Sequence, residues 1–366
     1  MLDLETMSEL HIDPRIASAK TLSTLFYTDP RMLEESKEKI FSRSWHYIDA
    51  SGENGAGVCV PVTLLEDFID EPLMLAQSRD SKLRCLSNVC THRGAILVDK
   101  ECKLNDIRCR YHGRRFSLDG KFLSMPEFKE VENFPSPDDD LRELPLFQIG
   151  KLLFTSLGAD QPQIYFSEML ERIGWLPLDK MLYRPEFSKD YTVNAHWALY
   201  CENYLEGFHI PFVHPGLNQV IDFSNYTTEL FRYSNLQLGT AKPDELVFDI
   251  PESSPDFGKR IGGYYFWVFP NMMFNFYPWG LSLNIVRPKT INQTTVSFYT
   301  FINDESKFNQ GAGSDLNQVE MEDEEVVESV QRGIRSRYYQ HGRYSVKHEK
   351  GTHHFHQIVS EFMNAS

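Results

Sequence analysis

The hydrophobic pattern of the chain changes twice. Residues 1–45 predict helical structure, in which Pro30 opens a segment with apolar residues at roughly helical spacing. The apolar residues at this spacing are Leu33, Ile40, Phe41 and Trp45. From about residue 47 to residue 158 the pattern becomes a series of short β-like runs broken by Gly, Asp, Asn and Pro, such as VCVPV, KLRCLSNV and LLFTSL. This second part predicts a small all-β module.

Helical and then strand-like patterns return after residue 158. Helices are predicted over 164–173 and 195–210. Four runs separated by turn residues follow, YYFWVF, MMFNFY, LSLNIVR and TTVSFYTF, and they predict an antiparallel meander. A polar loop then precedes a helix from about residue 318 to residue 338. The chain is therefore expected to be an α+β protein in three parts, 1–45, 46–158 and 159–366.

Composition narrows the class of function. The chain has 366 residues, of which 41% are hydrophobic, so it can bury sizeable cores in two globular domains. Its net charge of −15 argues against nucleic acid as a partner. The N-terminus carries acids early and has no apolar signal segment, and no window has the roughly 20 apolar residues that span a bilayer. We therefore expect a cytoplasmic protein without a membrane partner.

Two short segments combine cysteine and histidine. Six cysteines in a chain without a signal peptide favour reduced thiols or metal ligands. Cys90 and His92 form one pair, Cys109 and His112 form the other, and thiolate and imidazole suit iron or zinc. A structural zinc site remains the alternative, although zinc modules usually pair like ligands, whereas each pair here is mixed. Glycines follow both pairs, where they would let backbone N–H groups approach the sulfurs.

A second candidate metal site lies in NYLEGFHIPFVHPG. Glu206 and His209 are three residues apart, which would place them on one helix face, and Pro211 is expected to end that helix and leave His214 free to turn back. Two imidazoles and one carboxylate form a facial triad that leaves iron positions open. The missing carboxylate must come from elsewhere in the chain.

Periodicity selects Asp323 from the acid-rich run EMEDEEVVESVQRG. At about 100° per residue it shares a stripe with apolar residues, whereas the neighbouring glutamates point elsewhere. The stripe contains Val326, Val327, Val330 and Ile334, and the glutamates are Glu322, Glu324, Glu325 and Glu328. A buried carboxylate must be paired, protonated or metal-bound. The alternative is an acid at the start of a helix, favoured by the helix dipole.

These segments resemble the Rieske non-haem iron oxygenases, in their alpha or oxygenase component. CTHRG and CRYHGRRFSLDG match the two-loop signature of the family, and E-x₂-H-x₄-H with a late D-x₇-Q-x-G matches its catalytic domain. The resemblance implies an all-β Rieske [2Fe–2S] domain over 46–158 and a catalytic domain of helix-grip type over 159–366, on which the segment 1–45 packs. It covers nearly the whole chain.

The resemblance also implies the role of each site residue. Cys90 and Cys109 would hold one iron of the cluster, and His92 and His112 the other. His209, His214 and Asp323 would hold the mononuclear Fe(II). Glu206 would be the bridging acid that links this iron to His112 of the partner subunit in a head-to-tail homotrimer.

The resemblance implies O₂ as co-substrate, activated at the mononuclear iron. The chain has neither a dinucleotide fingerprint nor a plant-type ferredoxin motif, so a separate ferredoxin or flavin reductase would supply electrons from NAD(P)H. Glu at position 206 and the ending ESVQRGIRSRYY look like the branch that oxidises quaternary ammonium compounds such as carnitine, choline or betaines.

Several interpretations of the substrate and of the function remain open. The run from Tyr264 to Trp279 is dense in aromatic residues, which could hold a quaternary ammonium by cation–π attraction or could simply fill the core of the sheet. A ring-hydroxylating oxygenase, as a mono- or dioxygenase of an aromatic compound, is the rival function. An electron carrier without oxygenase activity is the remote one, as is a zinc-stabilised binding module.

Histidines near the end of the chain invite a further metal interpretation. His353, His354 and His356 could form a metal-binding tract, but a solvated C-terminal helix is the simpler expectation. Nothing in the sequence resembles a nucleophile elbow, so hydrolysis has no support.

Overall fold

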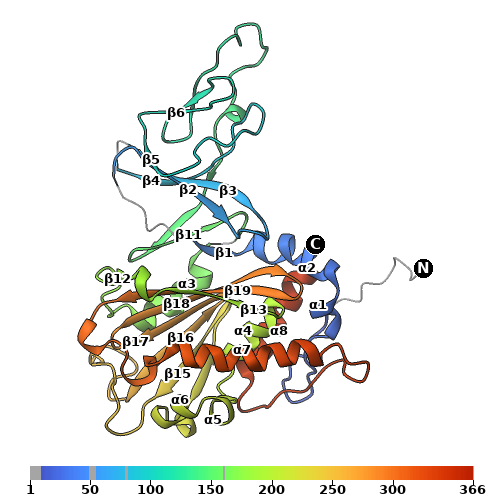
Figure 1. Cartoon of the computed structure of the whole chain (residues 1–366), viewed down its shortest axis with the longest axis vertical. Coiled ribbons are helices and arrows are strands. Elements are labelled where there is room, and N and C mark those ends of the chain that lie inside the picture. The colour runs from blue at the N-terminus through green and yellow to red at the C-terminus, as the bar shows by residue number, and fades with distance from the viewer. Residues whose placement is uncertain (1–9, 49–54, 79–80, 160, 366) are drawn as a thin grey trace. The chain divides into compact units, whose positions relative to one another are not determined.

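The computed structural model describes residues 10–48, 55–78, 81–159 and 161–365 (Figure 1). It divides the chain into two compact units, one formed by residues 45–158 and the other by residues 1–44 together with 159–366. Each unit has its own sheets and its own buried core.

The unit of residues 45–158 is built from strands, as the short apolar runs predict. A five-stranded antiparallel sheet has the order β5-β2-β3-β4-β9, and two three-stranded sheets have the orders β1-β11-β10 and β6-β7-β8. The strands are β1 (Trp45–Ile48), β2 (Val58–Leu64), β3 (Glu71–Gln77), β4 (Leu83–Ser87), β5 (Cys102–Lys103), β6 (Ile107–Arg108), β7 (Arg115–Phe116), β8 (Phe122–Ser124), β9 (Glu143–Leu144), β10 (Leu146–Ile149) and β11 (Leu152–Ser156).

The second unit is organised around one large antiparallel sheet. Its strand order is β12-β19-β18-β17-β16-β15-β14, and β13 also pairs with β19. The four predicted aromatic and aliphatic runs form β16 to β19 as consecutive neighbours, which confirms the expected meander. The strands are β12 (Leu182–Tyr183), β13 (Lys189–Val193), β14 (Thr227–Leu230), β15 (Ser234–Thr240), β16 (Ile261–Val268), β17 (Met272–Tyr277), β18 (Gly280–Thr290) and β19 (Gln293–Ile302).

Successive side chains of β17 lie on opposite faces of the sheet and have different partners there. The Phe274 ring contacts Phe166 of helix α3 on one face. On the other face, Asn275 accepts a hydrogen bond from the Tyr204 hydroxyl at the end of α4. Helix α7 packs against α4, and Figure 1 shows it running across the strands. The helices of this unit are α1 (Thr24–Thr28), α2 (Pro30–Lys39), α3 (Gln163–Ile173), α4 (Trp197–Tyr204), α5 (Ile210–Val213), α6 (Pro215–Val220), α7 (Leu316–Gly333) and α8 (Lys350–Asn364).

The N-terminal segment is less helical than predicted. Helices α1 and α2 are short, and residues 10–22 form turns and extended chain. Residues 1–9 lie outside the described residues. Asp29 separates the two helices because its carboxylate accepts from the N–H of Arg31 and caps α2, with Pro30 as the first helical residue. The segment packs against the rest of its unit, where Leu10 N–H donates to Asn364.

Helix α8 is buried, so the expectation of a solvated C-terminal helix is wrong. His353 and His356 are 5% and 0% exposed. His356 lies 3.1 Å from the Glu202 carboxylate, and its other ring nitrogen bonds to the Tyr344 hydroxyl. Buried polar groups persist where partners satisfy them, and these partners come from elements that the helical pattern of the segment does not reveal.

Candidate metal centres

The chain turns sharply after α4. Helix α4 ends at Tyr204, and the Glu206 carboxylate accepts hydrogen bonds from the backbone N–H groups of Phe208 and His209. Glu206 and His209 therefore lie in this turn and not on one helix face, which corrects the prediction. Pro211 lies in the first turn of α5 and does not end a helix, since proline fits the start of a helix, where its missing N–H has no partner to lose.

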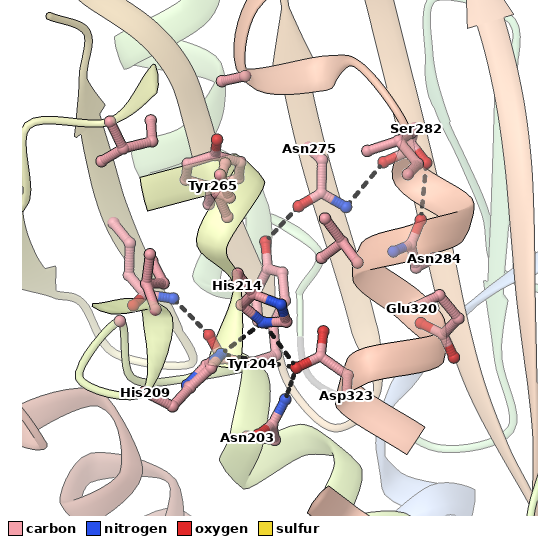
Figure 2. Close-up of a pocket in the computed structure, with 18 of the residues that line it drawn as sticks. Asn203, Tyr204, His209, His214, Tyr265, Asn275, Ser282, Asn284, Glu320 and Asp323 are labelled. Atoms are coloured by element: carbon pink, nitrogen blue, oxygen red, sulfur yellow. Dashed lines mark hydrogen bonds and ion pairs between the residues drawn. The ribbon is translucent and has the colours of Figure 1, made fainter. Parts of the chain in front are cut away.

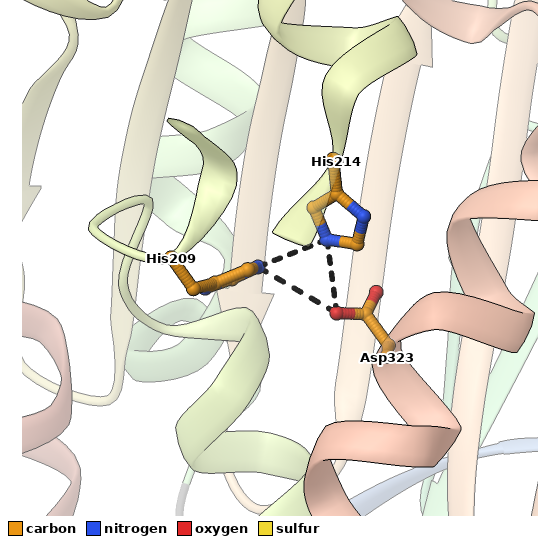
Figure 3. A group of neighbouring side chains, drawn as sticks. All are labelled: His209, His214 and Asp323. Carbon is orange, nitrogen blue, oxygen red and sulfur yellow. Dashed lines mark hydrogen bonds and ion pairs between the residues drawn. The ribbon is translucent and has the colours of Figure 1, made fainter. Parts of the chain in front are cut away.

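Three side chains from two separate segments converge on one point (Figure 3). Nε2 of His209 lies 3.1 Å from Nε2 of His214, and Oδ1 of Asp323 lies 3.1 Å from His214 Nε2 and 3.5 Å from His209 Nε2. Neighbouring ligands about 2.1 Å from an octahedral metal ion lie about 3 Å apart. Within the described part of the chain, this is the only group of three such ligand atoms within 4.8 Å of one another.

Carboxylates behind both imidazoles fix which ring nitrogen carries the proton. His209 Nδ1 lies 2.7 Å from Oε1 of Glu206, and His214 Nδ1 lies 2.7 Å from Oε2 of Glu322. Since carboxylates only accept, both Nδ1 atoms donate, and both Nε2 lone pairs then face the Asp323 oxygen. Burial alone would lower the pKa of His214, but Asp323 and Glu322 raise it above its ordinary value. The site therefore attracts positive charge and fits a divalent metal ion.

The position of Asp323 follows the predicted face of α7, but two details of that prediction are wrong. Glu322 does not point away, since it holds His214 and accepts from Gln318. Val330 is 42% exposed. The buried positions of the helix are Glu320, Val327 and Gln331. Asn203, which the sequence did not single out, donates from Nδ2 to Oδ1 of Asp323 across 2.5 Å.

A cavity of about 110 Å³ opens beside the triad (Figure 2). Its wall combines tyrosines and aliphatic residues with a few polar side chains from β17, β18 and α7. The tyrosines are Tyr200, Tyr204, Tyr226, Tyr265 and Tyr277. Of the aromatic run from Tyr264 to Trp279, only Tyr265 and Tyr277 line the cavity, while alternate residues such as Phe274 pack in the core. The interpretation of these aromatic residues as core is therefore confirmed for Phe274, and cation–π binding by Tyr265 and Tyr277 stays a prediction.

Glu320 is a buried acid in the wall of this cavity. It is 1% exposed, and its Oε2 accepts a hydrogen bond from the Tyr200 hydroxyl. Burial raises the pKa of Glu320 to about 8, and the hydrogen bond from Tyr200 offsets part of this rise. This residue is not among the site residues predicted from the sequence.

In the other unit, the two cysteine–histidine segments form matching loops. Cys90 N–H donates to the carbonyl of Ala95, and Cys109 N–H donates to that of Arg114, at 2.8 Å in both cases. Gly94 and Gly113 close the loops with φ of +72° and +73°, a left-handed conformation that glycine adopts without strain.

The loops bury the sulfurs and present the imidazoles. Cys90 and Cys109 are each 2% exposed, and all six cysteines are free thiols. Burial, helped by the neighbouring Cys109 thiol, raises the pKa of Cys90. The rings of His92 and His112 lie 4.8 Å apart at an edge angle. A tetrahedral zinc ion would hold its four ligand atoms less than about 4 Å apart. In the described residues, no three ligand atoms of this set lie within 4.8 Å of one another, so the set fits two metal ions better than one.

Two protein-family models match the chain. The model for "Ring hydroxylating alpha subunit (catalytic domain)" matches residues 178–365, more than half of the chain, and the model for "Rieske [2Fe-2S] domain" matches residues 44–135. The chain belongs to the Rieske-type ring-hydroxylating oxygenase family. It is therefore an oxidoreductase, with one domain for a [2Fe–2S] cluster and one for a non-haem iron, and the resemblance seen in its motifs is confirmed.

This oxygenase has relatives along most of its length. It is 28% identical to the choline monooxygenase of Arabidopsis thaliana chloroplasts, over 95% of this chain and 84% of the relative. It is 30% identical to the carnitine monooxygenase oxygenase subunit of Escherichia coli, over 94% of each chain. The solved structure of the quaternary ammonium Rieske monooxygenase CntA with L-carnitine has a TM-score of 0.72 at 23% identity, and covers 96% of this chain and 97% of its own.

The fold expectation is confirmed by these matches: the chain contains an all-β Rieske domain and a catalytic domain with an antiparallel sheet and helices. In the described residues, none of the helices combines the length and apolar character needed to cross a bilayer.

Proposed function

We propose that this oxygenase uses O₂ to hydroxylate or N-demethylate a small quaternary ammonium compound. The observation that carries the proposal is the cavity beside His209, His214 and Asp323, whose wall combines tyrosine rings with carboxylates. Tyrosine faces attract a cation, and the carboxylates add to that attraction. The relatives named for choline and carnitine oxidation support the same substrate class.

We assign the metal sites by residue. Cys90 and Cys109 hold one iron of the [2Fe–2S] cluster, and His92 and His112 hold the other. His209, His214 and Asp323 hold the mononuclear Fe(II), which supplies the redox chemistry that activates O₂ when it is bound. In a monooxygenation, O₂, two electrons and two protons convert a C–H bond into C–OH and release one water. If the carbon is an N-methyl group, the hydroxymethyl product then loses formaldehyde and leaves the demethylated amine.

The surrounding side chains prepare the triad for this chemistry. Glu206 and Glu322 hold the two imidazoles with Nε2 toward the metal position, and Asn203 orients the Asp323 carboxylate. The aliphatic and tyrosine wall limits the access of water to the reacting carbon.

Electrons must come from another protein, since the chain carries no nucleotide-binding fingerprint. We propose a separate reductase that oxidises NAD(P)H, and a head-to-tail homotrimer in which Glu206 also meets His112 of the partner subunit. The Glu206 carboxylate, shared between the two sites, would then couple the charge of the cluster to the mononuclear iron.

Isothermal titration of the iron-loaded protein with choline, carnitine, glycine betaine and benzoate tests the substrate class. Binding of at least one quaternary ammonium compound, followed by its oxidation when a reductase and NADH are added, is the expected result. Binding of benzoate alone would contradict it and would support the rival function, hydroxylation of an aromatic ring.

A further inference from the structure

Tyr265 lines the cavity (Figure 2), and its ring rests on a pair of glycines. Gly239 of β15 and Gly263 of β16 lie opposite each other in the antiparallel register. A Cβ atom added at Gly263 would lie 2.6 Å from both Cζ and the hydroxyl oxygen of Tyr265, and one added at Gly239 would lie 2.8 Å from its Cε2. Since non-bonded carbon atoms normally lie about 3.5–4.0 Å apart, the tyrosine ring fills the space that a side chain at either position would need.

Backbone conformation does not account for these two glycines. Neither Gly239 nor Gly263 has a positive φ, so alanine could adopt the same backbone at both positions. The strand pairing shifts register after Gly239, but such a bulge calls for glycine only where a residue is left-handed. Glycine inside a strand also costs conformational entropy. The remaining reason for glycine here is the close approach of the Tyr265 ring.

Gly263 depends on the Tyr265 ring alone. Apart from its chain neighbours, the three atoms nearest to a Cβ atom at Gly263 all belong to Tyr265, whereas a Cβ atom at Gly239 would also meet Cδ1 of Ile221 at 3.1 Å. Tyr265 is 9% exposed and packs among other buried residues, which include Ile221 and Tyr277. A methyl group at Gly263 would therefore move the ring away from the sheet, and the open side of the ring is the cavity.

Two further tyrosines of the cavity wall lie against glycines in the same way. A Cβ atom at Gly207 would lie 2.6 Å from Cε1 of Tyr226, and one at Gly313 would lie 2.8 Å from Cγ of Tyr277. Neither of these glycines has a positive φ. The repetition indicates that these glycines determine the width of the cavity, since the local backbone does not require them.

We propose that Gly263 determines which substrates the cavity admits, because it lets the Tyr265 ring lie close to the sheet and leaves room for a wide, branched head group beside the triad. The inference deepens the proposed function, on which it rests for the assignment of this cavity to the substrate. Gly263 acts through Tyr265, so it is a positioning residue that contacts neither the metal position nor the substrate.

Crystal structures of the iron-loaded wild type and of Gly263→Ala give the first test, which needs no ligand. The added methyl group should move the Tyr265 ring about 1 Å away from the sheet, because an approach of 2.6 Å must open to an ordinary contact. A ring that stays in place while β16 moves instead would overturn the proposal and leave the proposed function standing. Gly333→Ala is the matched control, because a Cβ atom there meets nothing within 4 Å, and it should leave the ring in place.

Binding of ions of different width gives the second test. Isothermal titration compares tetramethylammonium with tetraethylammonium on the iron-loaded wild type, Gly263→Ala and Gly333→Ala. Gly263→Ala should bind tetraethylammonium about tenfold more weakly than wild type and tetramethylammonium within about twofold, since a narrower cavity penalises the ligand that needs the space. Equal losses for both ions, or no loss for either, would indicate that Gly263 does not control width and would overturn the proposal.

The wild type separates this inference from the proposed function. If wild type binds only the smaller ion, the cavity lacks the room assigned to it, and the inference fails while the proposed function stands. If wild type binds neither ion, the proposed function is contradicted, and the crystal structures alone decide the inference.

Gly239→Ala repeats both tests from the neighbouring strand, in case Gly263→Ala does not fold. Its methyl group would approach Cε2 of the same tyrosine ring. Failure of both variants to fold would show that the Tyr265 ring cannot move, and would overturn the proposal.

Discussion

Nδ1 of His214 lies 2.7 Å from Oε2 of Glu322, so the acid that precedes the proposed iron ligand Asp323 in sequence supports a different proposed ligand, His214. Helix α7 thus contributes two neighbouring carboxylates with different tasks. One completes the triad, and the other fixes the orientation and tautomer of an imidazole whose side chain is only 1% exposed.

Replacement of Glu322 by alanine should therefore weaken the metal site. Loss of a carboxylate behind a histidine ligand typically lowers metal affinity 10- to 100-fold. We expect a loss of this size for Fe(II), measured by equilibrium titration of metal-free protein, with unchanged visible absorbance from the cluster in the other domain. Glu325→Ala, on the exposed side of the helix, is the control. Wild-type iron affinity in Glu322→Ala would show that this hydrogen bond does not position His214.

Glu206 should matter more for turnover than for metal binding. In Glu206→Gln the side-chain oxygen can still accept from His209 Nδ1, but the negative charge is lost. We expect both metal sites to remain filled while turnover with reductase falls about 10- to 100-fold. Iron analysis and NADH consumption coupled to product formation measure the two effects. Unaltered turnover would refute a coupling role for this carboxylate.

The stability of the catalytic unit should depend on the pH through His196. Burial lowers the pKa of His196 to about 3, and its Nδ1 accepts from the N–H of Ala198 at the start of α4. The unfolded chain binds the proton near pH 6.5, so stability from this group is complete above that pH and is lost as the pH falls toward 3. The slope is about 1.4 kcal/mol per pH unit between these values.

The substitution His196→Asn tests this dependence, since asparagine can still cap α4. Urea unfolding between pH 7 and pH 5 should show a shallower loss of unfolding free energy in the variant than in the wild type. His11→Asn changes an exposed histidine and should leave the slope unchanged. An identical slope in His196→Asn would exclude His196 as the source of acid sensitivity.

The sequence was sufficient to predict features that depend on one helix or on neighbouring strands. The strand meander followed from alternating apolar runs, because neighbouring strands joined by short turns pair with each other. Asp323 followed from helical periodicity, because a helix places residues three or four apart on one face. The same periodicity contained a signal for Glu320, three residues before Asp323, but an acid is normally assigned to the exposed face.

Partners from distant segments could not be predicted. Asn203 donates a hydrogen bond to Asp323 only because α4 packs on α7. His356 can be buried because the Glu202 carboxylate and the Tyr344 hydroxyl both contact its ring nitrogens. The prediction of helix at Glu206 is wrong because the Glu206 carboxylate accepts hydrogen bonds from the backbone N–H groups of Phe208 and His209. In a helix, backbone carbonyls would accept these bonds, and the sequence pattern does not distinguish the two cases.

The iron and acid-labile sulfide contents of purified protein distinguish the two metal sites when wild type is compared with Asp323→Ala. Wild type should contain about three irons and two sulfides per chain, and Asp323→Ala should keep about two irons, two sulfides and the cluster absorbance while oxygenase turnover is lost. A variant that retains the third iron, or a wild type with no labile sulfide, would contradict the account of one diiron cluster and one separate iron at His209, His214 and Asp323.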